Sequence, residues 1–343
     1  MQTPPEHILE TLPEALAKWL AAQGEPGYRL DQVLEWAHRR WADSFEAMTN
    51  LPASLRRRLA AAYRLAGPAE RHADVSADGR TGKLLLELED GERIESVWMT
   101  ERGRHTFCVS SQAGCPLGCL FCATGASGFT RDLTTAEILG QVTALARRTG
   151  ALRNVVFMGM GEPLLNLGAV GAVLTALADP RRFGLGARHL TVSTAGITPG
   201  IRELADGGVR PNLALSLNSP FEEERRKLMP VTRTYPLAEV LDACSDYADR
   251  TGRRLLIEYV LLGGVNTDPP AARGVAKIAR SLGALVNLIP FNAVEGCPFR
   301  APTRGERSRF AYILERAGVK VTERYRRGRD ISAACGQLRR SHR

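Results

Sequence analysis

The chain has 343 residues, of which 44% are hydrophobic, with seven cysteines and a net charge of +9. This length suffices to bury a full-sized core and one small accessory domain. The chain has no apolar run of membrane-spanning length and no signal-peptide pattern, so we expect no membrane partner and a cytoplasmic protein whose cysteines stay reduced.

Residues 1–66 are predicted to be helical, because apolar residues recur at helical spacing in 13–22 and 30–39, and a third helix starts near Pro52. Residues 67–82 are polar and contain Gly and Pro, which indicates a linker. Two apolar segments, 83–88 and 93–98, flank Asp90-Gly91 and predict a β-hairpin in which Glu95 would ordinarily be exposed.

From Phe107 onward, predicted strands alternate with predicted helices such as 135–148 and 167–178. The strand candidates are 107–111, 154–158, 189–193, 212–217, 255–261, 285–290 and 319–325. Such alternation is typical of right-handed βαβ units, so we predict an α/β fold with a partial barrel of about six units and its chemistry at the carboxyl ends of the strands. The predicted domains are a helical accessory domain (1–66), a linker with a hairpin (67–100) and a core barrel (101–343).

The most informative motif is the segment 114–122, GCPLGCLFC, which packs Cys115, Cys119 and Cys122 into eight residues. Three thiolates on a tight loop can ligate three irons of a [4Fe–4S] cluster and leave the fourth iron open to a ligand. The spacing is similar to that of the radical S-adenosylmethionine (SAM) superfamily. The alternative is a structural zinc site completed by Cys108 or His105.

Polar or glycine residues follow the ends of the predicted strands, as expected for the carboxyl edge of a barrel. They form the segments 159–163 (GMGEP), 193–196 (STAG), 216–218 (SLN) and 290–292 (PFN). Such groups suit the ribose, carboxylate and adenine edges of SAM, and Glu162 offers a carboxylate to an ammonium group. Phe121 either packs against an adenine ring or fills the loop.

The remaining cysteines differ in their surroundings. Cys244 is expected to be a core residue of a helix, and Cys297 is assigned no role. Cys108 precedes the cysteine loop, so its thiol could face the same cavity. Cys335 is flanked by glycine and small residues, which suits an accessible thiol.

The positive charge is concentrated near the end of the chain. Residues 1–82 carry ten Lys/Arg and eleven Asp/Glu, whereas residues 300–343 carry thirteen and four. The segment 324–329 combines Tyr325 with four arginines, which suits a nucleic-acid backbone; a solvated helix face and tail is the alternative.

Several of these segments together resemble the RlmN/Cfr family of radical SAM ribosomal RNA adenine methyltransferases. The segments that carry the resemblance are 107–115, 121–125, 156–163, 190–196, 289–292 and 330–338, within a match that runs from about Tyr28 to Leu338. Two positions depart from the family pattern: Asn218 stands where His is common, and Phe291 stands where Trp is frequent.

The resemblance implies a site and two cofactors. Cys115, Cys119 and Cys122 would ligate one [4Fe–4S] cluster. SAM, used twice per turnover, would be bound by the following residues: Gly161, Glu162, Ser193, Ser216, Leu217, Asn218 and Asn292.

The resemblance also implies a mechanism. One SAM would methylate Cys335, and a radical derived from a second SAM would take hydrogen from that methyl group, so that the resulting carbon radical adds to adenine. Cys108 would then resolve the protein–RNA crosslink by forming a disulfide with Cys335. Glu95 matches the proton-accepting position of the family.

The implied substrate is an adenosine in the peptidyl-transferase centre of 23S rRNA, methylated at C2, and also the adenosine beside the anticodon of some tRNAs. The helical unit and the basic C-terminal segment would bind this RNA. The resemblance further implies a monomer and an electron donor such as a flavodoxin or ferredoxin. The alternatives are C8 methylation of the same rRNA adenosine and a non-enzymatic, zinc-stabilised RNA-binding protein.

Overall fold

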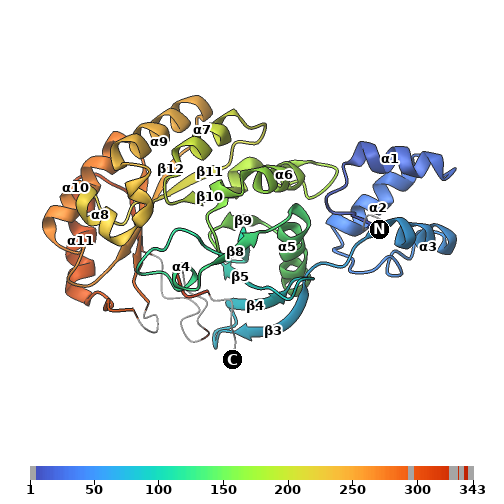
Figure 1. The fold of residues 1–343 in the computed structure, drawn as a ribbon, viewed down its shortest axis with the longest axis horizontal. Helices are drawn as coiled ribbons and strands as arrows, with labels where there is room; N and C mark the ends of the chain where they lie inside the picture. Colours follow the sequence, from blue (N-terminus) through green and yellow to red (C-terminus); the bar gives the residue numbers. More distant parts are fainter. Residues whose placement is uncertain (1–4, 293–296, 324–330, 332–335, 339–343) are drawn as a thin grey trace.

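The computed structural model describes residues 5–292, 297–323, 331 and 336–338. The first part of the chain forms a small helical lobe, which lies beside the main body (Figure 1). Its elements are β1 (Glu6–His7), α1 (Pro13–Ala22), α2 (Tyr28–His38), α3 (Ala53–Ala62) and β2 (Tyr63–Arg64). The apolar positions of the three helices, such as Leu16, Leu34 and Leu55, are buried against one another. Helical periodicity therefore predicted the three helices correctly, whereas the short strands β1 and β2 were not predicted.

In the described residues, the main body is organised around one mixed sheet of ten strands in the order β14-β13-β12-β11-β10-β9-β6-β5-β4-β3. The strands are β3 (Ala69–Val75), β4 (Thr81–Glu87), β5 (Arg93–Glu101), β6 (Arg104–Cys108), β9 (Asn154–Phe157), β10 (Leu190–Thr194), β11 (Asn212–Ser216), β12 (Leu255–Leu261), β13 (Leu285–Pro290) and β14 (Val321–Glu323). From β6 to β14 all neighbours pair in parallel, whereas β3, β4, β5 and β6 pair antiparallel.

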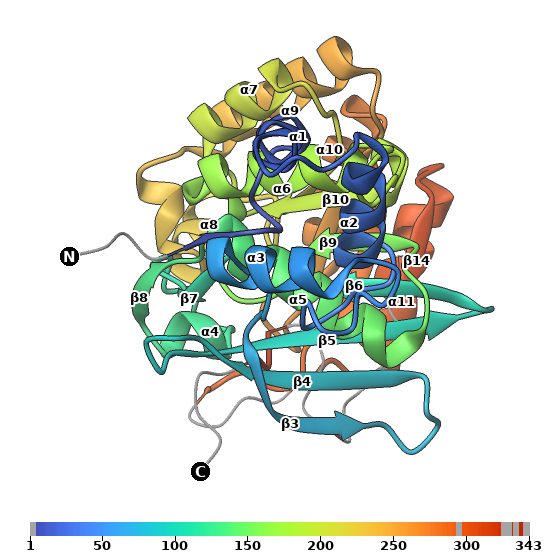
Figure 2. The same cartoon turned by 90° about the vertical axis from the view of Figure 1, so that its right-hand side faces the viewer.

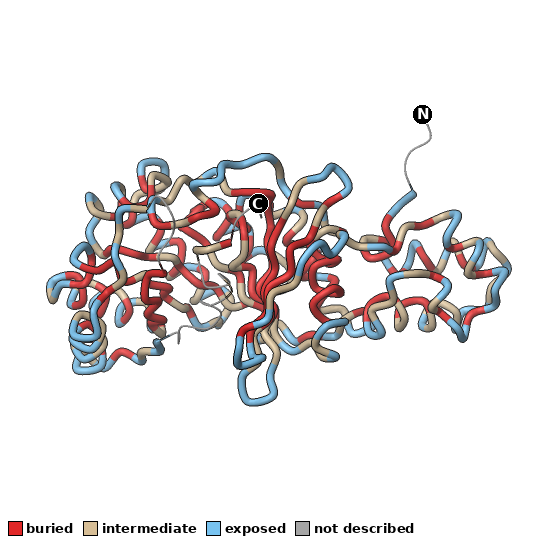
Figure 3. Tube along the Cα trace, turned by 90° about the horizontal axis from the view of Figure 1, so that it is seen from below, coloured by how far each residue is buried: buried red, intermediate tan, exposed pale blue. Residues whose placement is uncertain are grey.

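Helices α5 (Thr135–Thr149), α6 (Leu167–Ala178), α7 (Thr198–Asp206), α9 (Leu237–Thr251), α10 (Pro269–Ser281) and α11 (Arg304–Arg316) lie along the outer side of the parallel part (Figure 1). Each connects one parallel strand to the next, as right-handed βαβ units require. In the described residues the two ends of the strand order, β3 and β14, do not pair with each other, so the barrel is partial, as the sequence predicted. Figure 3 shows buried positions running through the strands and continuing into the helical lobe.

One prediction about the organisation is wrong. The segment 67–82 is not a linker, because residues 69–75 form the edge strand β3, which pairs with β4. Five of its seven residues are exposed, so β3 lacks the apolar alternation by which a strand is recognised in a sequence. The hairpin is therefore part of a three-stranded antiparallel extension of the main sheet, visible beside α5 in Figure 2.

The helical lobe is joined to the main body through buried polar contacts. Arg182, which follows α6, donates from Nε to Nε2 of His38 at 3.1 Å and from Nη2 to the carbonyl oxygen of Leu9. The ring of His38 also packs edge-on against Phe183. The lobe and the barrel thus share a specific joint. Among the described residues, no helix has the length and apolar character needed to cross a membrane.

Candidate active site

The cysteine loop lies between the two strands of a small hairpin, β7 (Gln112–Gly114) and β8 (Phe129–Asp132). The Cys115 N–H donates to the carbonyl oxygen of Gly128 at 2.9 Å. Gly114 has φ +89°, and a Cβ at this position would lie 2.0 Å from the Gly128 oxygen. Only glycine can therefore close the base of the loop.

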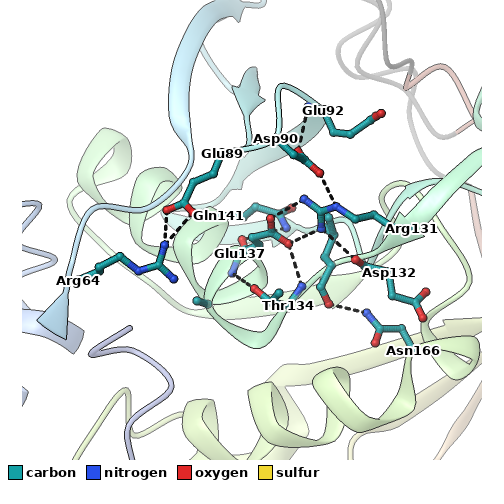
Figure 4. Close-up of polar contacts among 12 residues, drawn as sticks. Arg64, Glu89, Asp90, Glu92, Arg131, Asp132, Thr134, Glu137, Gln141 and Asn166 are labelled. Atoms are coloured by element: carbon teal, nitrogen blue, oxygen red, sulfur yellow. Dashed lines mark hydrogen bonds and ion pairs between the residues drawn. The ribbon is translucent and has the colours of Figure 1, made fainter. Parts of the chain in front are cut away.

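Arg131 of β8 fixes this hairpin to the rest of the sheet (Figure 4). Its guanidinium binds Asp90 in the β4–β5 turn at 2.6 Å and both oxygens of Glu137 in the first turn of α5 at 2.8 Å. Glu137 also forms a capping box with Thr134. The cysteine loop is thus held from outside by a network that joins the hairpin, the sheet and α5.

The three thiols of the loop belong to one cavity, and each cysteine is partly exposed. Burial raises the pKa of the Cys115 thiol to about 12, so a nearby cation is needed to hold it as a thiolate. A single zinc ion would need several ligands converging at about 2.0–2.3 Å. Among the described residues no three His, Cys, Asp or Glu side chains are grouped in that way. Three cysteine thiols that line one cavity are the donors that a [4Fe–4S] cluster takes, so the residues present fit such a cluster.

The cavity has a volume of about 180 Å³ and lies at the carboxyl ends of the parallel strands. Most of the residues predicted to bind SAM line it, namely Phe121, Gly161, Glu162, Ser193, Ser216, Asn218 and Asn292. Leu217 is fully buried and is not among the lining residues. The polar strand ends thus converge with the cysteine loop, as the barrel prediction required.

Glu162 is held in a fixed orientation inside the cavity wall. Its Oε2 accepts a hydrogen bond from the Ala195 N–H at 2.8 Å, and its Oε1 accepts one from the Leu164 N–H at 3.1 Å. Burial raises the pKa of Glu162 to about 7, despite these hydrogen bonds. A ligand that brings a positive charge would favour the ionised carboxylate.

Two buried oxygens in the cavity accept no hydrogen bond from any described residue: Oε1 of Glu258 and Oδ1 of Asn292. A buried polar atom without a partner is costly, so such atoms mark places where a ligand supplies the hydrogen bond. The residues present therefore fit a polar, donor-bearing cofactor. Asn292 was predicted from the sequence.

Glu258 was missed by the sequence analysis, although a signal was present. It is the only charged residue of the apolar strand β12, and its Oε2 accepts a hydrogen bond from the Nδ2 of Asn287, its direct neighbour on β13. A carboxylate inside an otherwise apolar parallel strand is expected only where it has a specific role.

Asn218 adopts a left-handed conformation with φ +54°. Its Oδ1 accepts from the Val260 N–H at 2.9 Å, so the side chain ties the end of β11 to β12. Asn tolerates this backbone region better than most residues, which makes it a workable substitute for the common histidine of the family.

Cys108 and Glu95 lie on the neighbouring strands β6 and β5. Cys108 is buried on β6 directly opposite Val97, and Glu95 stands two residues before Val97 on the same face of β5. Glu95 is only 1% exposed, so the expectation of an ordinary exposed hairpin glutamate is wrong. Cys108 is not among the residues lining the cavity.

Cys335 and the basic segment 324–329 with Tyr325 lie outside the described residues. The segment that follows Cys335 is described and contacts the cysteine loop: the Ala123 N–H donates to the Gly336 oxygen at 2.8 Å, and the Thr124 hydroxyl donates to the Leu338 oxygen at 2.9 Å. Gly336 and Leu338 also line the cavity.

The structure shows the surroundings of the two remaining cysteines, Cys244 and Cys297. Cys244 is fully buried on α9, as expected for a core residue. Cys297 has a contact that the sequence did not predict, because its thiol donates to the Leu120 oxygen of the cysteine loop at 3.3 Å.

The comparisons with known proteins identify the family of the chain. Residues 109–272 match the radical SAM superfamily, and residues 7–65 match the N-terminal domain of ribosomal RNA large subunit methyltransferases. The chain is 46% identical over 326 residues to the probable dual-specificity RNA methyltransferase RlmN of Gemmatimonas aurantiaca, with 94% of this chain and 89% of that protein covered. It is 43% identical over 330 residues to the dual-specificity RNA methyltransferase RlmN of Pelobacter propionicus, with 96% and 94% covered.

A solved structure shows the same architecture. The crystal structure of a radical SAM methyltransferase from Sphaerobacter thermophilus aligns with a TM-score of 0.94 at 42% identity, covering 98% of this chain and all of that one. Relatives of this identity over nearly the whole length share their fold and their class of reaction. The chain belongs to the RlmN family of radical SAM RNA methyltransferases.

Proposed function

We propose that this enzyme methylates C2 of an adenosine in the peptidyl-transferase centre of 23S rRNA and of the adenosine beside the anticodon in some tRNAs. The methyl group would be carried by Cys335, with a transient protein–RNA crosslink resolved by Cys108. The substrate assignment is supported by the similarity to proteins described as dual-specificity RNA methyltransferases. The need for reduced thiols is consistent with a reaction in the cytoplasm.

One observation carries the proposal: the cysteine loop, the polar strand ends and the segment after Cys335 meet in one cavity. A thiol that exchanges a methyl group with a cofactor and then reaches RNA must stand beside the cofactor. Gly336 and Leu338 contact the cysteine loop, and these contacts support the proposal that the Cys335 thiol acts beside the cofactor.

The proposal assigns roles to nine of the residues that line the cavity. Cys115, Cys119 and Cys122 would hold one [4Fe–4S] cluster, and Glu162, Ser193, Ser216, Asn218 and Asn292 would bind SAM, with Gly161 allowing close backbone approach. When bound, the cluster and SAM supply the methyl group and the radical that activates it, which polar methylation cannot provide at C2 because that carbon is not nucleophilic. The chain's own residues orient the ligand, exclude water and hold the carboxylate of Glu162 against its positive end.

Glu95 is proposed as the proton acceptor. Its burial on the same face of the sheet as Cys108 supports the assignment, because a base that serves a reaction on this face must lie on that face. Lys83 lies 2.7 Å from its carboxylate and keeps the negative charge compensated.

The test is nucleoside mass spectrometry on an rRNA fragment and a tRNA incubated anaerobically with iron-reconstituted protein, SAM and a reductant. We expect 2-methyladenosine in both RNAs, and its loss in Cys335→Ala but not in the matched control Cys244→Ala, which alters a core thiol of α9. An 8-methyladenosine product would contradict the C2 assignment and favour the C8 reaction. Cleavage of SAM without any methylated adenosine would contradict the RNA substrates.

A further inference from the structure

Two adjoining hollows on the outer side of α10 and α11 are lined by exposed cations and by no acidic residue. Their volumes are about 700 and 360 Å³, and Arg280 lines both. The basic groove, as we call it, comprises these exposed cations: Arg254, Arg273, Lys277, Arg280, Arg316 and Lys320. The remaining lining residues are small, apolar or hydroxylic, so nothing in the groove offsets its positive charge.

The cations of α10 form a regular row. Arg273, Lys277 and Arg280 are spaced i, i+4 and i+7, which places them on one face of the helix at intervals of about 6 and 4.5 Å. None of the six groove cations forms an ion pair with a described carboxylate, unlike Arg250 and Arg307 nearby. Arg280 and Arg316 lie in the last turns of α10 and α11, where the negative end of the helix dipole stabilises a cation. Arg273 and Lys277 lie farther from this end, so the dipole does not explain their presence.

The groove runs along the outer side of the barrel and reaches the end opposite the cavity. Arg254 directly precedes β12 and Lys320 directly precedes β14, so the groove is at the amino ends of these strands. The cavity is at the carboxyl ends. A ligand in the groove therefore cannot be the reacting adenosine, and an electron donor bound there would be far from the cysteine loop.

We propose that the basic groove binds the sugar–phosphate backbone of a part of the substrate RNA that is remote from the methylated adenosine. A polyanion with regularly spaced charges matches a row of unpaired cations better than a protein surface does, and phosphate neutralisation releases counterions. The inference depends on RNA being the substrate, but not on whether C2 or C8 is methylated. It predicts that a large folded RNA binds more tightly than a short stem-loop with the same target.

The test compares charge reversals in the groove, Arg280→Glu and Lys277→Glu, with the matched control Arg202→Glu, an exposed arginine of α7. For a long folded rRNA fragment at 0.15 M salt, each groove variant should weaken binding by about fivefold and reduce the salt slope by about one. Binding of a short stem-loop should be unchanged.

The groove assignment is contradicted if the control weakens binding as much as the groove variants, or if the groove variants bind the long RNA like wild type. If the groove variants bind the long RNA like wild type, and wild type captures an acidic protein that these variants do not capture, the groove would be assigned to that protein instead. RNA affinity is measured separately from the methylated product. The binding result for the groove therefore stays valid even if methylation proves not to occur at C2.

A second, independent observation concerns Arg225 of α8 (Glu222–Leu228), which is fully buried. Among the described residues its guanidinium donates only to neutral oxygens: from Nε to Leu217 O at 3.1 Å, from Nη1 to Thr232 Oγ1 at 2.5 Å, and from Nη2 to Ala195 O at 2.5 Å and Ser216 O at 3.3 Å. No ion pair joins it to a described carboxylate, and Glu222 and Glu223 of the same helix pair with Arg226 instead. A buried charge without a counterion is costly unless another group compensates it.

The cysteine loop is the nearest candidate for that compensating group. The Leu120 N–H donates to the Leu228 oxygen at 3.0 Å, one helical turn beyond Arg225, and Cys119 and Cys122 pack against the same apolar cluster as Leu228. A cluster with three thiolate ligands is anionic, and reduction adds a further negative charge.

We infer that Arg225 positions the carboxyl ends of β10 and β11 and also raises the reduction potential of the cluster proposed for the cysteine loop. A fixed positive charge in a low-dielectric site stabilises the more negative, reduced state. This inference rests on the proposed cluster, whose presence the iron content and absorbance of the reconstituted protein establish separately.

The test is a potentiometric titration of the reconstituted protein, followed by the electron paramagnetic resonance signal of the reduced cluster. In Arg225→Gln the midpoint potential should move to a more negative value, whereas Arg225→Lys should retain it while lowering thermal stability, since Lys makes fewer hydrogen bonds. Thr232→Asp places a carboxylate beside the guanidinium and should also move the potential to a more negative value.

Thr232→Asp keeps the guanidinium in place, so it decides the question even where Arg225→Gln does not fold. A cluster-loaded Thr232→Asp or Arg225→Gln protein with the wild-type potential would restrict Arg225 to a purely structural role. A wild-type protein that binds no cluster would instead contradict the proposed function itself.

Discussion

The ammonium nitrogen of Lys83 lies 2.7 Å from Oε1 of Glu95, and both side chains are almost completely buried. Lys83 stands directly opposite Val97, which in turn stands directly opposite Cys108, so the ion pair and the thiol share one face of the sheet. Val156 continues this row on β9, two residues before Met158, which lines the cavity. The antiparallel strands β4 and β5 therefore place the buried ion pair of Lys83 and Glu95 on the face of the sheet that continues toward the active site.

Removing one partner of this pair should be strongly destabilising. We expect Lys83→Met to lower the free energy of unfolding by about 3–5 kcal/mol, because it leaves the buried carboxylate of Glu95 uncompensated. The double variant Lys83→Met/Glu95→Gln should recover much of the loss. Urea unfolding measures both, and a double variant no more stable than Lys83→Met would contradict the coupling. The matched control is Arg181→Met, which removes an exposed pair with Glu14 and should leave stability unchanged.

SAM binding should depend on pH through Glu162. Its pKa is raised to about 7 by burial, so the carboxyl is mostly neutral at pH 6 and mostly ionised at pH 8. If the ionised form binds the cationic ligand, affinity should rise by about tenfold between these values. Calorimetric titration of the reconstituted protein at both pH values measures this. Glu162→Gln should bind more weakly and lose this increase; a variant that keeps the full tenfold rise would assign it to another group.

Cluster assembly should depend on Gly114. In Gly114→Ala the new Cβ would meet the Gly128 oxygen at 2.0 Å, so the base of the cysteine loop must open. We expect a large loss of bound iron after reconstitution, measured by iron content and visible absorbance. Gly118→Ala is the matched control, because Gly118 also has a positive φ but its Cβ would meet nothing within 4 Å. Equal iron loss in both variants would assign the effect to backbone strain alone.

The joint between lobe and barrel should weaken in acid. Burial lowers the pKa of His38 to about 3, with Arg182 adding to the effect, whereas the unfolded value is near 6.5. The unfolded chain then binds the proton more readily, so stability is fully present above pH 6.5 and is lost as the pH falls toward 3. Between pH 7 and pH 5 the loss should be about 2 kcal/mol.

Urea unfolding of wild type and His38→Gln at the two pH values isolates this contribution. The variant cannot titrate at this position, so its stability should fall by about 2 kcal/mol less than that of wild type over the same range. His7, whose pKa is also lowered by burial, remains in both proteins and cancels in the comparison. Equal pH dependence in the two proteins would contradict the assignment.

The predictable parts of this protein are those in which neighbours along the chain set the outcome. Helical periodicity placed α1, α5 and α6 close to their observed bounds, and apolar runs placed the parallel strands. The spacing of the three cysteines indicated their joint site, and polar strand ends indicated most of the cavity lining. Such signals are local, because hydrogen bonding in a helix and the close approach of a loop involve residues near in sequence.

Other features were decided only by the tertiary structure. β3 is an exposed edge strand that pairs with β4, and its sequence carries no apolar pattern from which a strand could be predicted. The burial of Glu95 depends on Lys83, and the burial of Glu258 depends on Asn287, each from another strand. The cost of burying a charge is set by the partners that folding brings to it, and these stand far away along the chain. The sequence by itself thus determined most of the helices and parallel strands and the segments that line the cavity. The burial, pairing and charge of individual side chains were determined by which strands and helices pack together.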